Sequence, residues 1–554
     1  MRNKLLIILI FFLAFVLRFW QLGENPSSLD WDEASLGYNA YSILKTGRDE
    51  YGSFLPLAIR SFGDYKPALY TYLTVIPVAI FGLNEFSTRF ISALFGTLTV
   101  IVAYFLIKEL FPRKSSIFYF LFSIFFSLSP WHIQFSRVAF EANTALFFFT
   151  SGIWLFLKSI RQGKFFVLSF ISFALSAYSY HSPRLVIPIL VVGMTFIYRK
   201  EIIRQIKWFI VAVVIFILMI IPIVAQFRFS TAARFGSVTV INPSERLGPS
   251  IKSIEYDSAR GDSLGKLMHN RRIVFGREIL AGYLDHFNFD FLFLKGDPPG
   301  RHHASGMGML YWFDLPFVLI GLFYLLRNRD KGASTILWWF LVAPIASSLT
   351  SGTPHAVRAL LYLPTYQIFT AFGVVRLLDY FKNSPSRSRF ATPGRWPNGL
   401  LPGVMSNGIL FLFFSFFVLN FFYYLHMYWI HTPSEYASEW QYGYREAVEE
   451  VAKIEQHYDK VVVTYRYDQP YIFFLFYNQV EPSWYQQNFK EEEIGRFRRS
   501  FGKYEFRNID WQKDSQLSNT LLVGTAGEIP ANAVGLIKEI NFPDGSVAFR
   551  IVGR

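Results

Sequence analysis

LLIILIFFLAFVL (residues 5–17), followed after a short interval by LDWDEA (residues 29–34), is the stretch on which the fold of this chain depends. The first string carries no charge and lies between the basic N-terminus and Arg18-Phe19-Trp20. No small-residue cleavage site follows it, so we expect a retained membrane helix with an aromatic anchor and not a signal peptide. The second string places three carboxylates and a tryptophan just beyond that helix.

The composition indicates a membrane protein. Of the 554 residues, 52% are hydrophobic and only 17% are charged, whereas a soluble domain is about 45–50% apolar and about 25% charged. The net charge of +14 does not indicate nucleic acid, because the basic residues lie in short segments between apolar runs, as the positive-inside rule requires. The chain has no cysteine, which excludes disulfides, thiolate metal sites and a cysteine nucleophile.

Long apolar runs recur from the N-terminus to about residue 425, and they predict transmembrane helices. They lie at 5–17, 67–83, 90–107, 115–131, 142–157, 165–180, 185–198, 208–227, 310–326, 333–353, 359–375 and 398–425.

The run at 67–83 decides the topology. If it lies in the membrane interface as a juxtamembrane helix, the basic connections all fall on one side, with 20 Lys/Arg against 4 Asp/Glu. If the run at 67–83 instead crosses the bilayer, the basic connections no longer all fall on one side of the membrane. We therefore predict about eleven spans in the cytoplasmic (plasma) membrane, with a cytoplasmic N-terminus and an extracytoplasmic C-terminus. Residues 382–398 are predicted to be a flexible inner linker.

Two domains are expected. Residues 1–425 form the transmembrane domain, with a first outer loop at 21–89 and a large outer loop at 228–309. Residues 426–554 form a small extracytoplasmic α/β domain. In it, 438–457 predicts a helix, 460–465 and 520–524 predict buried strands, and 534–540 with 546–552 predict a β-hairpin. The fold class is thus a polytopic α-helical membrane protein carrying a small α/β domain.

The acidic cluster is the first candidate for chemistry. Moving a sugar off a phosphate needs a carboxylate that takes a proton or stabilises positive charge, and cations that hold the departing phosphate. Asp32 and Glu33 would sit at the level of lipid headgroups. Equally, Asp30, Asp32 and Glu33 are consistent with solvated loop acids or helix N-caps.

Three further motifs are predicted on the same outer side. Lys66, just before Pro67, is placed to reach lipid phosphates or simply to snorkel. The segment 84–89 ends in Arg89 at the mouth of the second span. Arg137 and Glu141 are four residues apart, so on one helix they would share a face and could form an ordinary salt bridge.

Taken in order, these four motifs resemble the GT-C-fold glycosyltransferases that use polyprenyl-phosphate sugars (glycosyltransferase family 39 type), among them protein O-mannosyltransferases and aminoarabinose transferases. The resemblance covers about residues 1–380. It implies that Asp32 is the catalytic carboxylate with Glu33 beside it, and that Lys66 contacts the donor phosphate. Glu141 stands where the family often has an aspartate, so its role stays open between catalysis and substrate binding. The resemblance also implies a reaction without a bound metal or other cofactor.

Other candidates for donor-phosphate or substrate binding lie along the outer face. They are Tyr65, Arg89, Arg137, Arg301, His302 and Arg358, with Arg271 and Arg272 as further basic candidates. Tyr178, Tyr180, His181, Arg184 and His355 also fall on this side, where an aromatic belt accounts for the tyrosines. His302 and His303 are adjacent and not four apart, which argues against a metal site.

We therefore expect a membrane glycosyltransferase that moves a sugar from a polyprenyl-phosphate donor to a hydroxyl of a lipid, protein or polysaccharide acceptor, by inversion. Its partners would be the lipid-linked donor, the acceptor and membrane lipids, with no nucleic acid. The alternative is a polytopic transporter or a flippase for lipid-linked sugars. Such proteins place ionisable residues near the bilayer midplane, whereas these spans are nearly free of charge.

Overall fold

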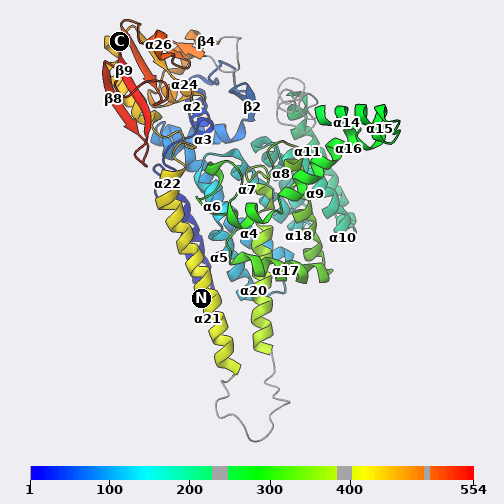
Figure 1. The fold of residues 1–554 in the computed structure, drawn as a ribbon. Helices are drawn as coiled ribbons and strands as arrows, with labels where there is room; N and C mark the ends of the chain where they lie inside the picture. The colour runs from blue at the N-terminus through cyan, green and yellow to red at the C-terminus, as the bar shows by residue number, and fades with distance from the viewer. Residues whose placement is uncertain (1, 227–246, 384–401, 492–498) are drawn as a thin grey trace.

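The computed structural model describes residues 2–226, 247–383, 402–491 and 499–554. Within them the chain is a helical bundle with a small sheet domain at one end (Figure 1). The apolar helices are α1 (Arg2–Phe19), α3 (Leu69–Phe81), α4 (Glu85–Leu110), α5 (Ser116–Ser127), α7 (Glu141–Ser159), α8 (Phe165–Ser179), α9 (Pro183–Ile197), α11 (Ile206–Gln226), α17 (Asp314–Arg327), α18 (Lys331–Val342), α20 (Thr365–Asn383) and α21 (Pro402–His426).

Each predicted apolar run coincides with one of these helices, but several helices are shorter than the runs. Among the described residues, three helices are long and apolar enough to cross a membrane: Glu85–Leu110, Ile206–Ala225 and Phe411–Glu435. A bent pair, α5 with α6 (Pro130–Arg137), makes up to four. The membrane crossing of the shorter helices stays a prediction, as does the boundary between domains at residue 425.

Proline explains where the runs break. Pro130 stands at the first position of α6, and the chain bends by 50° between α5 and α6. The run at 333–353 is interrupted at Pro344, so α18 ends at Val342 and a single turn, α19 (Ile345–Ser348), follows. Proline lacks the N–H that a helix interior needs and clashes with the preceding turn.

Helices α17 and α20 cross at close range. A Cβ atom on Gly321 of α17 would lie 2.0 Å from the carbonyl oxygen of Phe369, and one on Gly373 of α20 would lie 2.1 Å from that of Phe317. The two glycines therefore let the backbones of α17 and α20 touch, as small residues do in membrane helix pairs.

The predicted linker 382–398 lies almost wholly outside the described residues.

The C-terminal domain is a seven-stranded sheet with the order β4-β5-β6-β3-β7-β9-β8. Its strands are β3 (Lys460–Val463), β4 (Phe489–Glu491), β5 (Arg499–Phe501), β6 (Tyr504–Phe506), β7 (Thr520–Gly524), β8 (Leu536–Asn541) and β9 (Val547–Gly553). β3 runs parallel to both β6 and β7, and the other pairs are antiparallel. The predicted strands and hairpin are confirmed. The predicted helix at 438–457 begins later, as α23 (Tyr444–Ile454).

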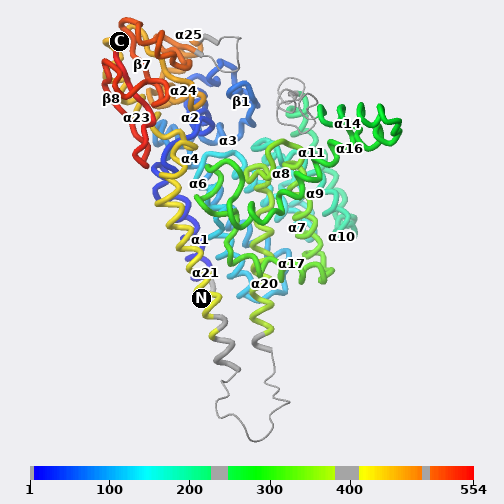
Figure 2. Tube along the Cα trace, in the orientation of Figure 1, coloured from blue at the N-terminus to red at the C-terminus, as the bar shows by residue number. Residues whose placement is uncertain are grey.

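The first outer loop forms α2 (Trp31–Thr46) and a short hairpin of β1 (Ala58–Ser61) and β2 (Asp64–Pro67). This hairpin was not predicted from the sequence. α2 packs between the bundle and α24 (Pro470–Tyr477) of the C-terminal domain, so Ala34 and Tyr38 share a buried apolar cluster with Phe473. Figure 2 shows α2 and the hairpin lying beside the sheet domain at the same end of the bundle. The large outer loop forms α14 (Gly248–Ala259), α15 (Gly265–Met268) and α16 (Arg271–Asp285), which extend from the bundle (Figure 1).

Candidate active site

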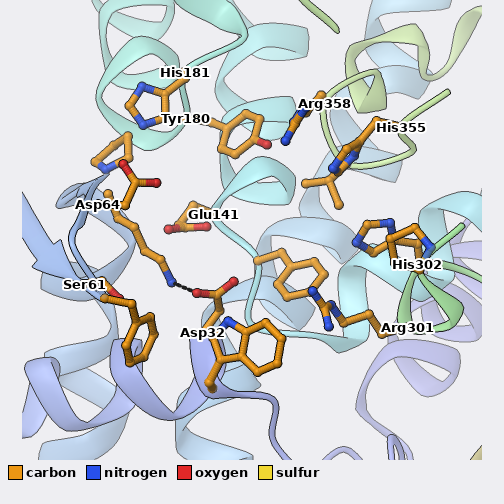
Figure 3. Close-up of a pocket in the computed structure, with 17 residues that line it drawn as sticks. Asp32, Ser61, Asp64, Glu141, Tyr180, His181, Arg301, His302, His355 and Arg358 are labelled. Atoms are coloured by element: carbon orange, nitrogen blue, oxygen red, sulfur yellow. Dashed lines mark hydrogen bonds and ion pairs between the residues drawn. The ribbon is translucent and has the colours of Figure 1, made fainter. Parts of the chain in front are cut away.

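A cavity of about 340 Å³ opens where the first outer loop meets the ends of the bundle helices. Its lining comes from five parts of the chain: the first outer loop (the start of α2 and the β1–β2 hairpin), the start of α7, the turn after α8, the loop around residue 300 and the loop around residue 357. In Figure 3, Asp32, Glu141, Arg301 and Arg358 surround this common space. Acids and bases from distant segments therefore share one hollow.

The capping of α2 determines which acid reaches the cavity. Asp30 is the N-cap: its Oδ1 accepts a hydrogen bond from the backbone N–H of Glu33 at 2.8 Å, and Glu33 Oε2 accepts one from the N–H of Asp30 at 3.3 Å. This reciprocal capping box turns Asp30 and Glu33 inward. Asp32, in the first turn of the helix, lines the cavity.

Asp32 forms an ion pair with Lys66 (Figure 3). Lys66 comes from β2 and is only 8% exposed, so it does not snorkel to a surface. Burial disfavours its charge, but the attraction of Asp32 and Glu141 outweighs burial and raises the pKa of Lys66 above its usual value. Lys66 is thus a cation held inside the cavity.

Glu141 lines the cavity as the first residue of α7. A carboxylate at a helix N-terminus is stabilised by the partial positive charge of the unpaired N–H groups. α6 ends at Arg137 and α7 begins at Glu141, so the premise that the two share one helix is wrong. The chain is extended at Val138 and Phe140.

Arg301 and Arg358 are the other cations of the lining. The guanidinium of Arg301 lies over the ring of Trp31, 4.8 Å from its centroid, and Arg301 Nε is 3.5 Å from Asp30 Oδ2. Arg358 donates to Thr350 Oγ1 at 2.7 Å and to the carbonyl oxygen of Ser351 at 2.8 Å. Both arginines are therefore oriented before any ligand arrives.

Asp30 carries an unusual carboxyl. It is completely buried, and burial raises its pKa to about 7, although Arg301 acts in the opposite direction. Asp32 and Glu33 add to the rise because like charges disfavour a further ionisation.

Two of the predicted arginines lie elsewhere. Arg89 binds Glu33 inside the protein, and neither side chain is exposed to solvent. Arg137 donates to the carbonyl oxygens of Leu17 and Asn25, both at 2.9 Å. Neither arginine lines the cavity, and Glu33 does not either.

Some of the remaining predicted residues line the cavity and others do not. His302 lines the cavity, as do Tyr180, His181 and His355. Tyr65 does not line it, although its carbonyl oxygen lies 3.3 Å from His181 Nε2. Arg271 and Arg272 begin α16, away from the lining.

Sequence reasoning missed Ser61 and Phe62, which line the cavity from the β1–β2 turn. Phe62 and Gly63 both have positive φ, 53° and 78°, as a two-residue hairpin turn of type I′ requires. Gly63, at the second position of the turn, was the available sequence signal for it.

Comparison with known proteins identifies the fold. Residues 8–234 match the family model described as dolichyl-phosphate-mannose-protein mannosyltransferase. ArnT from Cupriavidus metallidurans, whose crystal structure in the apo state is known, shares 12% sequence identity with this chain. The two structures match with a TM-score of 0.54 over 100% of this chain and 98% of ArnT. The structure of the same protein bound to undecaprenyl phosphate gives a TM-score of 0.50 over 98% of this chain and 97% of that one, at 12% identity.

This chain has the GT-C fold. The predicted resemblance is thereby confirmed at the level of the fold, which is that of a multi-pass membrane protein. The archaeal oligosaccharyltransferase AglB from Archaeoglobus fulgidus, in complex with an inhibitory peptide and a dolichol-phosphate, is 13% identical, with a TM-score of 0.48 over 86% of this chain. The present GT-C chain spans 63% of the length of AglB. No curated protein matches the present chain in sequence.

Proposed function

We propose that this protein transfers a sugar from a polyprenyl-phosphate donor to a hydroxyl group of an acceptor, with inversion at the anomeric carbon. The acceptor would be a lipid, a protein or a polysaccharide. The observation that carries the proposal is the placement of Asp32 and Lys66 in one cavity with Arg301 and Arg358. A carboxylate beside several cations is what glycosyl transfer from a phosphate leaving group requires.

In the proposed reaction Asp32 acts as the general base. Its carboxylate takes the proton of the acceptor hydroxyl while the hydroxyl oxygen forms a bond to the anomeric carbon. The bond between that carbon and the phosphate oxygen breaks, and the electron pair leaves with polyprenyl phosphate. A single displacement of this kind inverts the anomeric configuration.

Cations of the cavity would hold the departing phosphate. The phosphate competes with Asp32 for Lys66, so donor binding loosens the Asp32–Lys66 ion pair and makes the carboxylate available as a base. Arg301 and Arg358 offer guanidinium groups, whose donors match phosphate geometry. Glu141 helps to hold Lys66 charged.

The site would face the outside of the cytoplasmic membrane. The basic connections between apolar runs hold 20 Lys/Arg against 4 Asp/Glu, which favours a cytoplasmic location for them. The cavity belongs to the opposite set of loops. ArnT, which has the same fold, was crystallised with undecaprenyl phosphate, and a carrier of that chemistry is the proposed leaving group here.

The test is a donor-consumption assay on the purified full-length protein in lipid nanodiscs. A panel of polyprenyl-phosphate monosaccharides is offered with mixed acceptors, and release of polyprenyl phosphate is followed by mass spectrometry. We expect release from at least one donor, with the sugar recovered on an acceptor. Translocation of intact donors in proteoliposomes without cleavage would instead favour the flippase alternative.

A further inference from the structure

Three residues from two loops meet at the cavity wall. Asp297 lies in the turn before the 3-10 turn Gly300–His302, His302 ends that turn, and His355 precedes another 3-10 turn at Leu360–Tyr362. One ligand atom from each lies within 4.8 Å of the other two. Asp297 and His302 are 3% and 4% exposed. In the sequence only His302 and His303 are close together, and His355, more than 50 residues further on, reaches His302 through the fold.

The distances suit a metal ion. Asp297 Oδ2 is 2.6 Å from His302 Nδ1 and 4.0 Å from His355 Nδ1. Two ligands at the Zn–N and Zn–O bond lengths of a tetrahedral site lie about 3.3 Å apart. The observed separations bracket that value, so small side-chain rotations would bring the three donors onto one ion.

Unsatisfied polar atoms lie at the same place. Within the part of the chain that the structure describes, no hydrogen-bond partner reaches the buried atoms Asp297 Oδ1 and His355 Nδ1. Buried polar atoms are nearly always paired, because leaving one unpaired costs about 1–3 kcal/mol. A cation between these side chains would satisfy them.

A backbone hydrogen bond also orients the carboxylate of Asp297. The backbone N–H of Ala356 donates to Asp297 Oδ2 at 2.8 Å, and a hydrogen bond of this kind fixes metal-ligating carboxylates in position.

The charge of the surroundings permits a cation. The charged residues that line the cavity are the acids Asp32, Asp64 and Glu141 and the bases Lys66, Arg301 and Arg358. The formal charges of these three acids and three bases sum to zero. The carboxylate of Asp297, which is not part of the lining, therefore adds a negative charge that the lining residues do not compensate.

We propose that Asp297, His302 and His355 bind a divalent first-row transition-metal ion, for which Zn²⁺ is the probe. Two imidazoles and one carboxylate with an open position are a common ligand set for such ions, whereas Mg²⁺ prefers oxygen ligands. Because His302 and His355 line the cavity, the open position faces the space in which the donor phosphate would lie. That role rests on the proposed function; the binding of the ion does not.

The test measures metal binding and not activity. The full-length protein, purified without a histidine tag and stripped with a chelator, is titrated with Zn²⁺ in competition with a metal indicator. We expect about one equivalent bound tightly, with Asp297→Asn and His355→Ala each weakening affinity by about 100-fold or more. The exposed His457 supplies the control variant His457→Ala, which should bind as the wild type does. Mg²⁺ should not displace Zn²⁺.

Two results would overturn the metal site. One is wild-type binding below about 0.1 equivalent, since a formed site binds stoichiometrically. The other is wild-type affinity in both ligand variants, which would indicate an adventitious ion only. If either variant fails to fold, Co²⁺ bound to the wild-type protein decides the matter, because nitrogen and oxygen ligands in a tetrahedral site give intense visible absorption that excess Zn²⁺ abolishes. A protein that transfers sugar but shows no such absorption would keep the proposed function and lose the metal site.

Discussion

Glu33 accepts two hydrogen bonds from Arg89, one from Nε to Oε1 at 2.9 Å and one from Nη2 to Oε2 at 2.8 Å. Neither side chain is exposed. Glu33 Oε1 also accepts the backbone N–H of Ala139 at 2.7 Å, and Arg89 Nη1 donates to the carbonyl oxygen of Pro26 at 2.9 Å. The pair thus joins α2 and α4 to the extended link before α7, and it positions the helix that presents Asp32.

Removing one partner of this pair should destabilise the protein. Glu33→Gln leaves the Arg89 charge buried and uncompensated, and we expect a loss of about 3–5 kcal/mol. Thermal unfolding in detergent measures it. The control is Glu450→Gln, which breaks an exposed pair with Lys453 and should cost less than about 1 kcal/mol. Equal effects of the two variants would mean that the buried pair does not hold the loop.

Lys66 should affect donor affinity more than stability. Lys66→Met removes a charge that hydrogen-bonds a phosphate, and such bonds contribute about 1.5–3 kcal/mol, which corresponds to a loss of roughly 10- to 150-fold in affinity for polyprenyl phosphate. Binding is measured on protein in nanodiscs. Lys295→Met, which removes an exposed lysine paired with Asp290, should bind normally. Unchanged affinity in Lys66→Met would exclude Lys66 as a phosphate ligand.

Asp30 should make stability depend on pH. Its pKa of about 7 in the fold exceeds the ordinary 3.8, so the folded protein binds more protons between those values. Stability is therefore lost as pH rises from about 4 to about 7, by at most about 4 kcal/mol. Asp30→Asn keeps the capping oxygen but cannot ionise, so its stability relative to wild type should increase from pH 5 to pH 8.

Thermal midpoints of both proteins at several pH values measure this difference. Asp544→Asn, in the exposed turn between β8 and β9, is the control, because hydrogen bonds from Ser546 lower the pKa of Asp544, so this carboxyl does not change its charge between pH 5 and pH 8. A constant difference between Asp30→Asn and wild type over the range would contradict the assignment.

The α17–α20 crossing should not tolerate a side chain. Gly373→Ala would place a Cβ atom 2.1 Å from a backbone oxygen of α17, and overpacking of this kind costs roughly 1–3 kcal/mol. Gly408→Ala in α21 meets no atom within 4 Å, so it should be neutral or slightly stabilising. Differential scanning fluorimetry of the two variants compares them. The account of the crossing fails if Gly373→Ala melts at the wild-type temperature.

The fold was predictable where local pattern decides it. Apolar runs gave the helices, and Pro543-Asp544-Gly545 gave the hairpin between β8 and β9. Pro130 and Pro344 lie inside the apolar runs 115–131 and 333–353, and the helices break beside these prolines although the runs continue. The β1–β2 hairpin was missed because its strands are only four residues long each and lack strong alternation.

The site was predictable only in part, because closeness in sequence does not determine where a side chain points. Asp32 and Glu33 are neighbours, yet the capping box turns Glu33 toward Arg89 and leaves Asp32 at the cavity. The meeting of Asp297 with His355 depends on how two distant loops pack, and no local pattern encodes it. Arg137 was predicted at the site for its charge, whereas the structure uses its donors to bind backbone carbonyls of the first loop.

The most direct test of the account is turnover by Asp32→Asn. With a donor that the wild type consumes, we predict a fall in the rate of polyprenyl phosphate release of at least about 100-fold, the contribution of a general base. Thermal stability should stay close to that of the wild type, and affinity for polyprenyl phosphate should not fall, because the Asp32 carboxylate no longer competes with the phosphate for Lys66. Release within a few-fold of the wild-type rate would contradict the assignment of Asp32 and, with it, the mechanism built on the cavity.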